Sequence, residues 1–360
     1  MVLLLRPAEM AGLISMREAI DAVEEGFREW GSVPSLNAPR RRIHVPSGVR
    51  VSVHQGGVPG LGVTGLMTHC ERVSIQPDGT QRYSLRGRPV QVLYSADTGE
   101  LLALLVGEPL PKELPLNGVT ALRTAATSAV GTRYLARPES SKLGMLGSGA
   151  QAQHHLLALR QLYRLDAVKV YSRSPANRAA FAQEMTVMQG LPVRAVDTAR
   201  EAVEGADIVV AATNSNTPVL DGSWLAPGAH VVSIVASNVG LLQTGAVREK
   251  RRELDDETVR RAAAIVVCSR EQAQQDQQAD LYDRVERGLL RWEQVQELGE
   301  VIAGKAAGRT SPDQITLFKN NAGQGVADVA LGARLYQLAR AHKAGVELDL
   351  DGIEYRESLP

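Results

Sequence analysis

The fold of this 360-residue chain is decided by residues 143–152, which read LGMLGSGAQA. A short apolar strand, Leu143 to Leu146, runs directly into a glycine-rich turn, and a helical stretch from Gln153 to Leu162 follows. This is the G-x-G-x-x-A form of the dinucleotide-binding fingerprint in its required strand, turn and helix context. We therefore expect a Rossmann domain that holds a nicotinamide dinucleotide.

Each small residue of the turn has a physical role. Gly147 permits the tight turn, Gly149 lets the backbone approach the pyrophosphate, and Ala152 allows close helix packing. The helix N-terminus adds free N–H groups and positive potential. The predicted pyrophosphate contacts are Gly147, Ser148, Gly149, Ala150 and Gln151. A plain structural turn is the alternative.

The segments that follow the turn repeat the same pattern of strand and helix. Short apolar runs alternate with helical stretches, at 143–146, 168–171, 193–196, 208–212, 230–235 and 265–267. Such alternation is typical of a doubly wound parallel sheet, so the fold class is α/β. Thr213 and Ser215 follow the fourth strand and should lie at the nicotinamide end of the cofactor.

The first ~110 residues have a different pattern, and a chain of this length favours two cores. Ser15 and Glu18 form a capping box before a helix, and two hairpins are predicted, at 43–53 and 90–106. This indicates an α+β domain with an antiparallel sheet. The tail helix around 329–339 should pack back on that domain. The polar stretch 271–280 is interpreted as a solvated loop or helix face.

The overall composition narrows the possible partners. Lys plus Arg and Asp plus Glu are both 40, so no summed field favours nucleic acid or a membrane surface. No apolar run is long enough to span a bilayer, and no spacing suggests a metal site. The two cysteines, Cys70 and Cys268, are too few for a disulfide framework. We expect a cytoplasmic protein with a small-molecule substrate.

The second Rossmann strand indicates the choice of cofactor. It ends Tyr171-Ser172-Arg173-Ser174, without the carboxylate that usually accepts from the ribose 2′-hydroxyl in an NAD site. Ser172 and Ser174 can donate to phosphate oxygens, and Arg173 can pair with a 2′-phosphate. NADPH is therefore predicted over NADH, unless Arg173 is only a solvated loop charge.

Four segments together resemble the ornithine cyclodeaminase and mu-crystallin family. They are the turn 147–152 with 171–174, the run 123–129 (RTAATSA), the run 206–213 ahead of Pro218, and 315–319 ahead of Asp328. The resemblance implies a Rossmann domain at 123–319 inserted in a substrate-binding and dimerisation domain made of 1–122 plus 320–360. It also implies a homodimer.

In that family two arginines clamp the substrate carboxylate, and their counterparts are Arg40 and Arg123. A bidentate guanidinium holds a planar carboxylate rigidly and places the adjacent carbon against the nicotinamide. Two alternatives stay open. Arg123 could form a structural ion pair, and the register at Arg40 could slip because Arg41 and Arg42 adjoin it.

The chain departs from the family's cyclodeaminases at two ionisable positions. Thr64 stands where the resemblance places a lysine, and Asn238 stands where it places the aspartate that acts as base, with Ser237 there instead if the alignment shifts. An amide cannot take a proton at neutral pH. Asn238 and Thr64 would line the pocket, and His54, more than His69, could replace the missing proton donor.

These departures favour one reaction. Hydride transfer to an iminium needs little help from the protein, since substrate and cofactor supply most of the reactivity. We expect an NADPH-dependent reductase of an imine, or dehydrogenase of the amine, of an amino acid-like substrate in a biosynthetic pathway. The alternatives are a non-catalytic NADPH-binding protein like the crystallin, and an NAD-dependent amino-acid cyclodeaminase.

Overall fold

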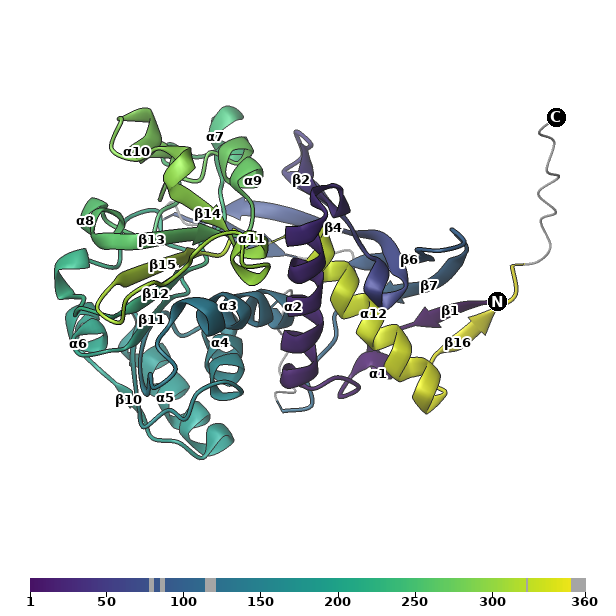
Figure 1. Cartoon of the computed structure of the whole chain (residues 1–360), viewed down its shortest axis with the longest axis horizontal. Helices are drawn as coiled ribbons and strands as arrows, with labels where there is room; N and C mark the ends of the chain where they lie inside the picture. Colours follow the sequence, from purple (N-terminus) through teal and green to yellow (C-terminus); the bar gives the residue numbers. More distant parts are fainter. Residues whose placement is uncertain (78–80, 85–87, 114–120, 322, 351–360) are drawn as a thin grey trace.

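The computed structural model describes residues 1–77, 81–84, 88–113, 121–321 and 323–350. Its described strands form two eight-stranded sheets, one on each side of the molecule (Figure 1). Helices α2 (Met16–Ser32), α3 (Ala121–Leu135) and α12 (Gly325–His342) lie between the two sheets. No helix in the described part of the chain is long and apolar enough to cross a membrane.

The second sheet is the expected parallel, doubly wound one. Its strand order is β10-β9-β8-β11-β12-β15-β13-β14, and every pairing is parallel. The strands are β8 (Lys142–Leu146), β9 (Ala167–Tyr171), β10 (Val193–Ala195), β11 (Ile208–Ala211), β12 (His230–Ser233), β13 (Ala262–Val267), β14 (Val295–Glu297) and β15 (Ile315–Lys319). All six predicted strands are present. The sequence pattern did not predict β14 and β15 as strands, nor the position of β15 between β12 and β13.

Both faces of this sheet are buried, as a doubly wound sheet requires. Ile208 and Val210 of β11 belong to one apolar core, and Val209 and Ala211 belong to the other. The described helices of this region are α4 (Ala150–Arg160), α5 (Pro175–Gln189), α6 (Ala199–Val203), α7 (Val239–Gln243), α8 (Asp256–Arg261), α9 (Arg270–Gln275), α10 (Tyr282–Glu286) and α11 (Leu298–Ile302).

The first sheet is antiparallel apart from the β1–β7 pair, in the order β16-β1-β7-β6-β4-β3-β2 with β5 beside β4. Its strands are β1 (Val2–Leu5), β2 (Asn37–His44), β3 (Val49–Val58), β4 (Val63–Ile75), β5 (Gln81–Ser84), β6 (Val90–Ser95), β7 (Leu101–Val106) and β16 (Val346–Leu348). Both predicted hairpins are confirmed. A short helix, α1 (Pro7–Met10), follows β1.

Two helices cover one face of the first sheet. Ser15 caps α2 as predicted, accepting from the backbone of Glu18 at 3.2 Å and donating its own N–H to the Glu18 carboxylate at 2.9 Å. Helix α12 packs against α2, β3 and β4, as expected of the tail helix. A Cβ on Gly56 would overlap the backbone of Val326, so this glycine lets the start of α12 touch β3. The assignment of 1–122 plus 320–360 to one domain stays a prediction, and 351–360 lie outside the described residues.

One expectation about the Rossmann region was wrong. Residues 271–280 do not form a solvated face, because Gln272, Asp276 and Asp280 are all buried. The polarity of the stretch is explained by its partners. Asp276 pairs with Arg40 and Asp280 pairs with Lys319, and both cations come from segments distant in the sequence.

Two fully buried histidines in the Rossmann region predict sensitivity to acid. Burial lowers the pKa of His155 to about 4 and that of His230 to about 3, against an ordinary value of 6.5. The unfolded chain therefore binds more protons as the pH falls below 6.5, so stability is lost as the pH falls from 6.5 toward 4. Each histidine should cost about 2 kcal/mol at pH 5.

The measurement is the free energy of unfolding by urea between pH 7 and pH 4.5. His230→Asn keeps a side chain that can bond Thr316 but cannot titrate. The free energy of unfolding should therefore fall less steeply with pH in this variant, by the contribution of one histidine. The same substitution at the exposed His342 serves as control. An equal slope in the wild type and His230→Asn would contradict the prediction.

Candidate active site

A cleft of about 540 Å³ lies at the carboxyl ends of β8, β9 and β11. It opens at the point where the strand order reverses between β8 and β11, which is where ligands bind in doubly wound sheets. The structure brings together here all ten predicted cofactor-binding residues: Gly147, Ser148, Gly149, Ala150, Gln151, Ser172, Arg173, Ser174, Thr213 and Ser215.

The glycine turn has the geometry that the fingerprint requires. Gly147 has a φ of +115°, and a Cβ there would overlap the carbonyl oxygen of Ala212. A Cβ on Gly149 would meet nothing within 4 Å, so the backbone at Gly149 faces open space at the start of α4. A pyrophosphate fits this position because nothing separates it from the backbone and the helix N-terminus.

The rim of the cleft is polar and carries one unpaired charge. The hydroxyl of Ser148 donates to that of Ser172 at 2.9 Å, and Ser174 caps α5. Arg178 is committed to structure, since it pairs with Asp197. Arg173 is exposed, lines the cleft, and has no hydrogen-bond or ion-pair partner within the described ranges. A phosphate monoester at this rim would therefore find a free guanidinium.

A buried charge cluster, Glu253–Asp280–Lys319, supports the nicotinamide end of the cleft. Glu253 accepts from the backbone N–H of Thr213 at 2.6 Å and from its hydroxyl at 2.8 Å. Lys319, at the end of β15, donates to Asp280 at 2.8 Å and to Ser233 at 2.9 Å. The cluster fixes the loops after β11 and β12. Sequence reasoning missed Glu253, because it stands in a run of mixed acidic and basic residues, 248–257, in which nothing distinguishes it.

A second constellation lies in the region between the two sheets, where β3 meets α3 and α12. His54 Nδ1 lies 2.7 Å from one carboxylate oxygen of Asp328, and Arg123 Nε donates to the other at 2.7 Å. All three side chains are at least 94% buried. Arg123 and Asp328 also line a small cavity with Met67 and Glu108. The structure thus joins two predicted site residues, His54 and Arg123, through Asp328. The sequence assigned this aspartate no role beyond its place after the motif 315–319.

Arg40 lies beside this constellation. Its guanidinium pairs with Asp276, and its backbone N–H donates to Gln272. Arg40 Nη1 and His54 Nε2 both lie within 3.0 Å of the point where a Cβ on Gly323 would stand. Gly323, with a φ of +92°, therefore keeps a cation and an imidazole nitrogen close to each other.

Burial and charge set the protonation states. Burial lowers the pKa of His54 to about 4; Asp328 opposes this shift, and Arg40 and Arg123 reinforce it. Burial would raise the pKa of Asp328, but Arg123 and His54 outweigh it and lower that pKa to about 2. At neutral pH the pair is therefore an ionised aspartate and a neutral imidazole. If His54 donates Nδ1–H to Asp328, its Nε2 is left as an acceptor.

The hydrogen bonds of two other predicted pocket residues lie outside this constellation. Thr64 is exposed on the opposite face of the sheet from His54, and its hydroxyl donates to the carbonyl of Gly56 at 3.2 Å. Asn238 is buried, but its amide donates to the carbonyl of Glu249 and accepts from the N–H of Arg251, both at 2.9 Å. The Thr64 expectation fails because side chains alternate across the sheet, and Asn238 is occupied in holding a loop.

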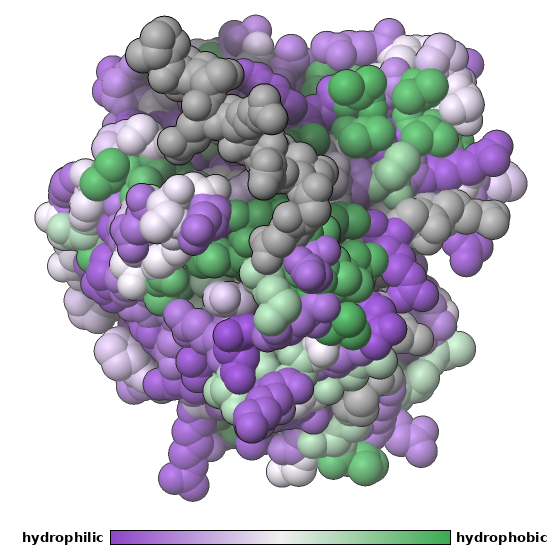
Figure 2. Space-filling model, turned by 90° about the vertical axis from the view of Figure 1, so that its right-hand side faces the viewer, coloured by the Kyte–Doolittle hydropathy of each residue, from purple (hydrophilic) through white to green (hydrophobic). Residues whose placement is uncertain are grey.

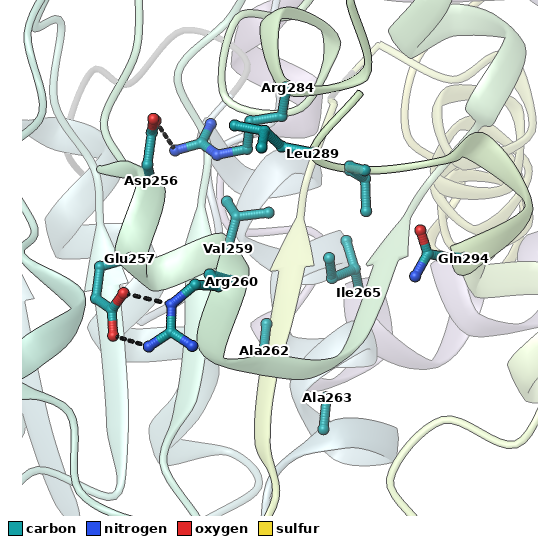
Figure 3. A pocket seen from close by; sticks show the side chains of 11 residues that line it. Asp256, Glu257, Val259, Arg260, Ala262, Ala263, Ile265, Arg284, Leu289 and Gln294 are labelled. Atoms are coloured by element: carbon teal, nitrogen blue, oxygen red, sulfur yellow. Dashed lines mark hydrogen bonds and ion pairs between the residues drawn. The ribbon is translucent and has the colours of Figure 1, made fainter. Parts of the chain in front are cut away.

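A different pocket, of about 300 Å³, lies at the other edge of the parallel sheet near the start of β13 (Figure 3). Its charged side chains are paired with one another. Glu257 bonds Arg260, and Asp256 bonds Arg284 (Figure 3). It shares no residue with the cofactor cleft or with the His54–Asp328–Arg123 constellation, so we assign it no part in the chemistry.

The fold and the cleft define a dinucleotide-binding protein with a buried His54–Asp328–Arg123 constellation in the region between its two sheets. Residues 2–343 match the model of the ornithine cyclodeaminase/mu-crystallin family. The chain belongs to this family, as the motifs at 123–129 and 147–152 indicate.

Individual relatives cover nearly the whole chain. The Δ1-pyrroline-2-carboxylate reductase of Bacillus cereus is 29% identical over 97% of this chain and 100% of its own length. The solved structure of the Thermococcus litoralis Δ1-pyrroline-2-carboxylate reductase with NADH and L-proline has a TM-score of 0.80 and 29% identity, covering 96% of this chain and 100% of its own. An archaeal alanine dehydrogenase dimer with bound NAD has a TM-score of 0.78 and 28% identity, covering 97% and 99%.

Proposed function

We propose that the protein is an NAD(P)H-dependent oxidoreductase that reduces the C=N bond of an α-imino acid, or oxidises the corresponding amine. The observation that carries the proposal is the buried His54, which is bonded to Asp328, the partner of Arg123, and lies close to the guanidinium of Arg40. In an α-imino acid the carboxylate and the nitrogen are attached to the same carbon. An arginine and an imidazole nitrogen side by side match that arrangement.

Two arginines bind the substrate carboxylate, and His54 exchanges a proton with the substrate nitrogen. Arg40 and Arg123 hold the carboxylate, which fixes the adjacent carbon for attack. His54 Nε2 accepts a hydrogen bond from the N–H of the iminium and so orients the C=N bond. The bound nicotinamide supplies the hydride. When the hydride adds to carbon, the C=N electron pair becomes the lone pair of the amine nitrogen. His54 lies next to this nitrogen and can exchange a proton with it.

The relatives suggest the first substrates to try. Cofactor absorbance should be followed with Δ1-pyrroline-2-carboxylate, other cyclic imines, and 2-oxo acids mixed with amines, using NADPH and NADH in parallel. Substrate-dependent loss of NADPH is expected. Tight cofactor binding without oxidation would favour a binding protein like the crystallin. Ammonia release from ornithine or lysine without net NADH consumption would favour a cyclodeaminase.

The preference for NADPH over NADH rests on Arg173, and it is tested by Arg173→Ala. Loss of a charge-assisted phosphate contact costs roughly 1.5–3 kcal/mol, so the Kd for NADPH should rise about 10- to 100-fold while that for NADH stays constant. The exposed Arg164, which does not line the cleft, provides the control Arg164→Ala. An unchanged ratio of the two Kd values would mean that Arg173 is only a solvated loop charge and does not contact the cofactor.

A homodimer built through the first sheet is also proposed. The helices among the described residues cover one face of that sheet. On the other face, Leu66, Val92 and Leu104 form a half-buried apolar row across β4, β6 and β7. Figure 2 shows apolar side chains gathered on this side of the molecule. Sedimentation should give twice the chain mass, and Leu66→Glu should shift it toward one chain mass. A cytoplasmic location stays a prediction.

A further inference from the structure

A line of polar side chains runs along the buried face of β3 and β4. In the β3–β4 register Arg50 faces Glu71, Ser52 faces His69, and His54 faces Met67. Since alternate residues of a strand share a face, Arg50, Ser52 and His54 all point to the same side as Glu71 and His69. A sheet face that packs on helices is normally apolar, so polar residues here require a reason.

The line is connected from the active site outward. The rings of His54 and His69 meet edge to face, with centroids 5.5 Å apart. His69 Nε2 lies 3.5 Å from Glu71, which also pairs with Arg50. Exposure rises along the line, from 2% for the His54 side chain to 9% for His69 and 13% for Glu71. The outer end of the line therefore reaches solvent.

Three polar atoms in the middle of the line lack a partner. Ser52 Oγ, His54 Nε2 and His69 Nδ1 are buried and make no hydrogen bond within the described ranges. An unpaired buried polar atom is costly, and native proteins rarely leave several in one place without a polar group to satisfy them. A water molecule would satisfy a site with two to four such partners.

The reaction itself creates a need for this line. Converting a protonated iminium and NADPH to an ammonium product and NADP⁺ consumes one proton from solution, and the reverse reaction releases one. The proton ends on nitrogen, while the hydride and the former C=N electron pair end in the new C–H bond and the N–H bond. Because His54 is 98% buried, a proton that it gives or takes must be exchanged through neighbouring groups.

We propose that His69, together with Ser52 and Glu71, forms the path along which a water-bridged proton passes between His54 and solvent; this rests on the proposed function. His69 is thus a positioning residue that acts through His54. The charged groups facing the path are Arg40 from β2, Arg50 from β3, Glu71 from β4, Arg123 from α3 and Asp328 from α12, with Glu108 at the cavity beside Arg123.

The kinetic test uses His69→Gln and His69→Asn in the full-length protein with NADPH and an imine that the wild type reduces. Each variant should lower kcat about tenfold, increase the solvent deuterium isotope effect on kcat, and leave the Kd for NADPH and the KM for the imine within twofold. Added imidazole should restore kcat, since it can carry the proton in place of the lost ring. His230→Gln, a change at another buried histidine, should show none of this.

A second readout does not depend on turnover. In 15N-histidine spectra of the wild type, His54 should appear as the Nδ1–H tautomer. The His69→Gln substitution should change the Nε2 signal and the titration midpoint of His54. Unchanged kcat, or a fall in kcat without imidazole rescue, would overturn the path. So would unchanged His54 spectra, even if no imine is ever reduced. An inactive wild type with the expected spectra would instead count only against the proposed function.

Discussion

Replacing Arg123 with methionine is expected to lower kcat/KM for an imino acid by about 10³-fold. Arg123 is 95% buried, and truncating one partner of a buried charged contact costs roughly 2–5 kcal/mol. Affinity for NADPH should not change, because Arg123 does not line the cofactor cleft. Steady-state kinetics on the best imine, together with cofactor fluorescence, give both values.

The control for this variant concerns stability. Methionine leaves Asp328 as a buried carboxylate without its cation, bonded to His54 alone, which is destabilising by roughly 3–5 kcal/mol. The double variant Arg123→Met with Asp328→Asn removes that charge, and Arg123→Lys keeps a cation but loses the bidentate fork. If Arg123→Lys and a folded Arg123→Met both kept wild-type kcat/KM, Arg123 would be only a structural ion pair.

The second large effect is expected at His54. His54→Asn keeps an amide that can bond Asp328 but has no group able to take a proton, so kcat should fall by about 10²- to 10³-fold. KM should change little, since the arginines bind the carboxylate. The comparison variant is His44→Asn, at the end of β2 and outside the constellation.

The pH dependence of kcat/KM tests whether the neutral imidazole of His54 acts as the base. Its pKa is lowered to about 4 by burial, so the neutral base is present above that pH and is lost as the pH falls through it. For oxidation of the amino acid, kcat/KM should therefore have an acid limb near pH 4 in the wild type. His54→Asn should lack this limb. The same limb in both proteins would mean that another group titrates.

The cofactor half of the molecule could be predicted from sequence because its determinants are local. The turn 147–152 and the alternation of strand and helix each depend on residues within a few positions of one another, as does the Ser15 capping box in the other half. The ten predicted cofactor-binding residues come from three separate segments, and they are close in the structure because the parallel strands before them end at one edge of the sheet. The insertion of β15 between β12 and β13 is not local, and no pattern in the chain indicates it.

The substrate side was harder to predict because its contacts join distant segments. His54 and Asp328 are 274 residues apart, and Arg40 and Asp276 are 236 apart. The stretch 271–280 appeared solvated because polarity by itself does not reveal a buried partner. The resemblance places Thr64 and Asn238 in the pocket. Strand alternation puts Thr64 on the opposite face of the sheet from His54. The place of Asn238 in the pocket stays a prediction, with its amide bonded to the backbone of a loop.

The position of β15 has a consequence for synthesis on the ribosome. Neither sheet is complete until the last fifth of the chain is made, since β15 (Ile315–Lys319) joins β12 to β13 and β16 (Val346–Leu348) is the edge strand beside β1. Until then the nascent chain carries open strand edges, which are prone to pair with other chains. Late stop codons should therefore yield aggregated products rather than a smaller working enzyme.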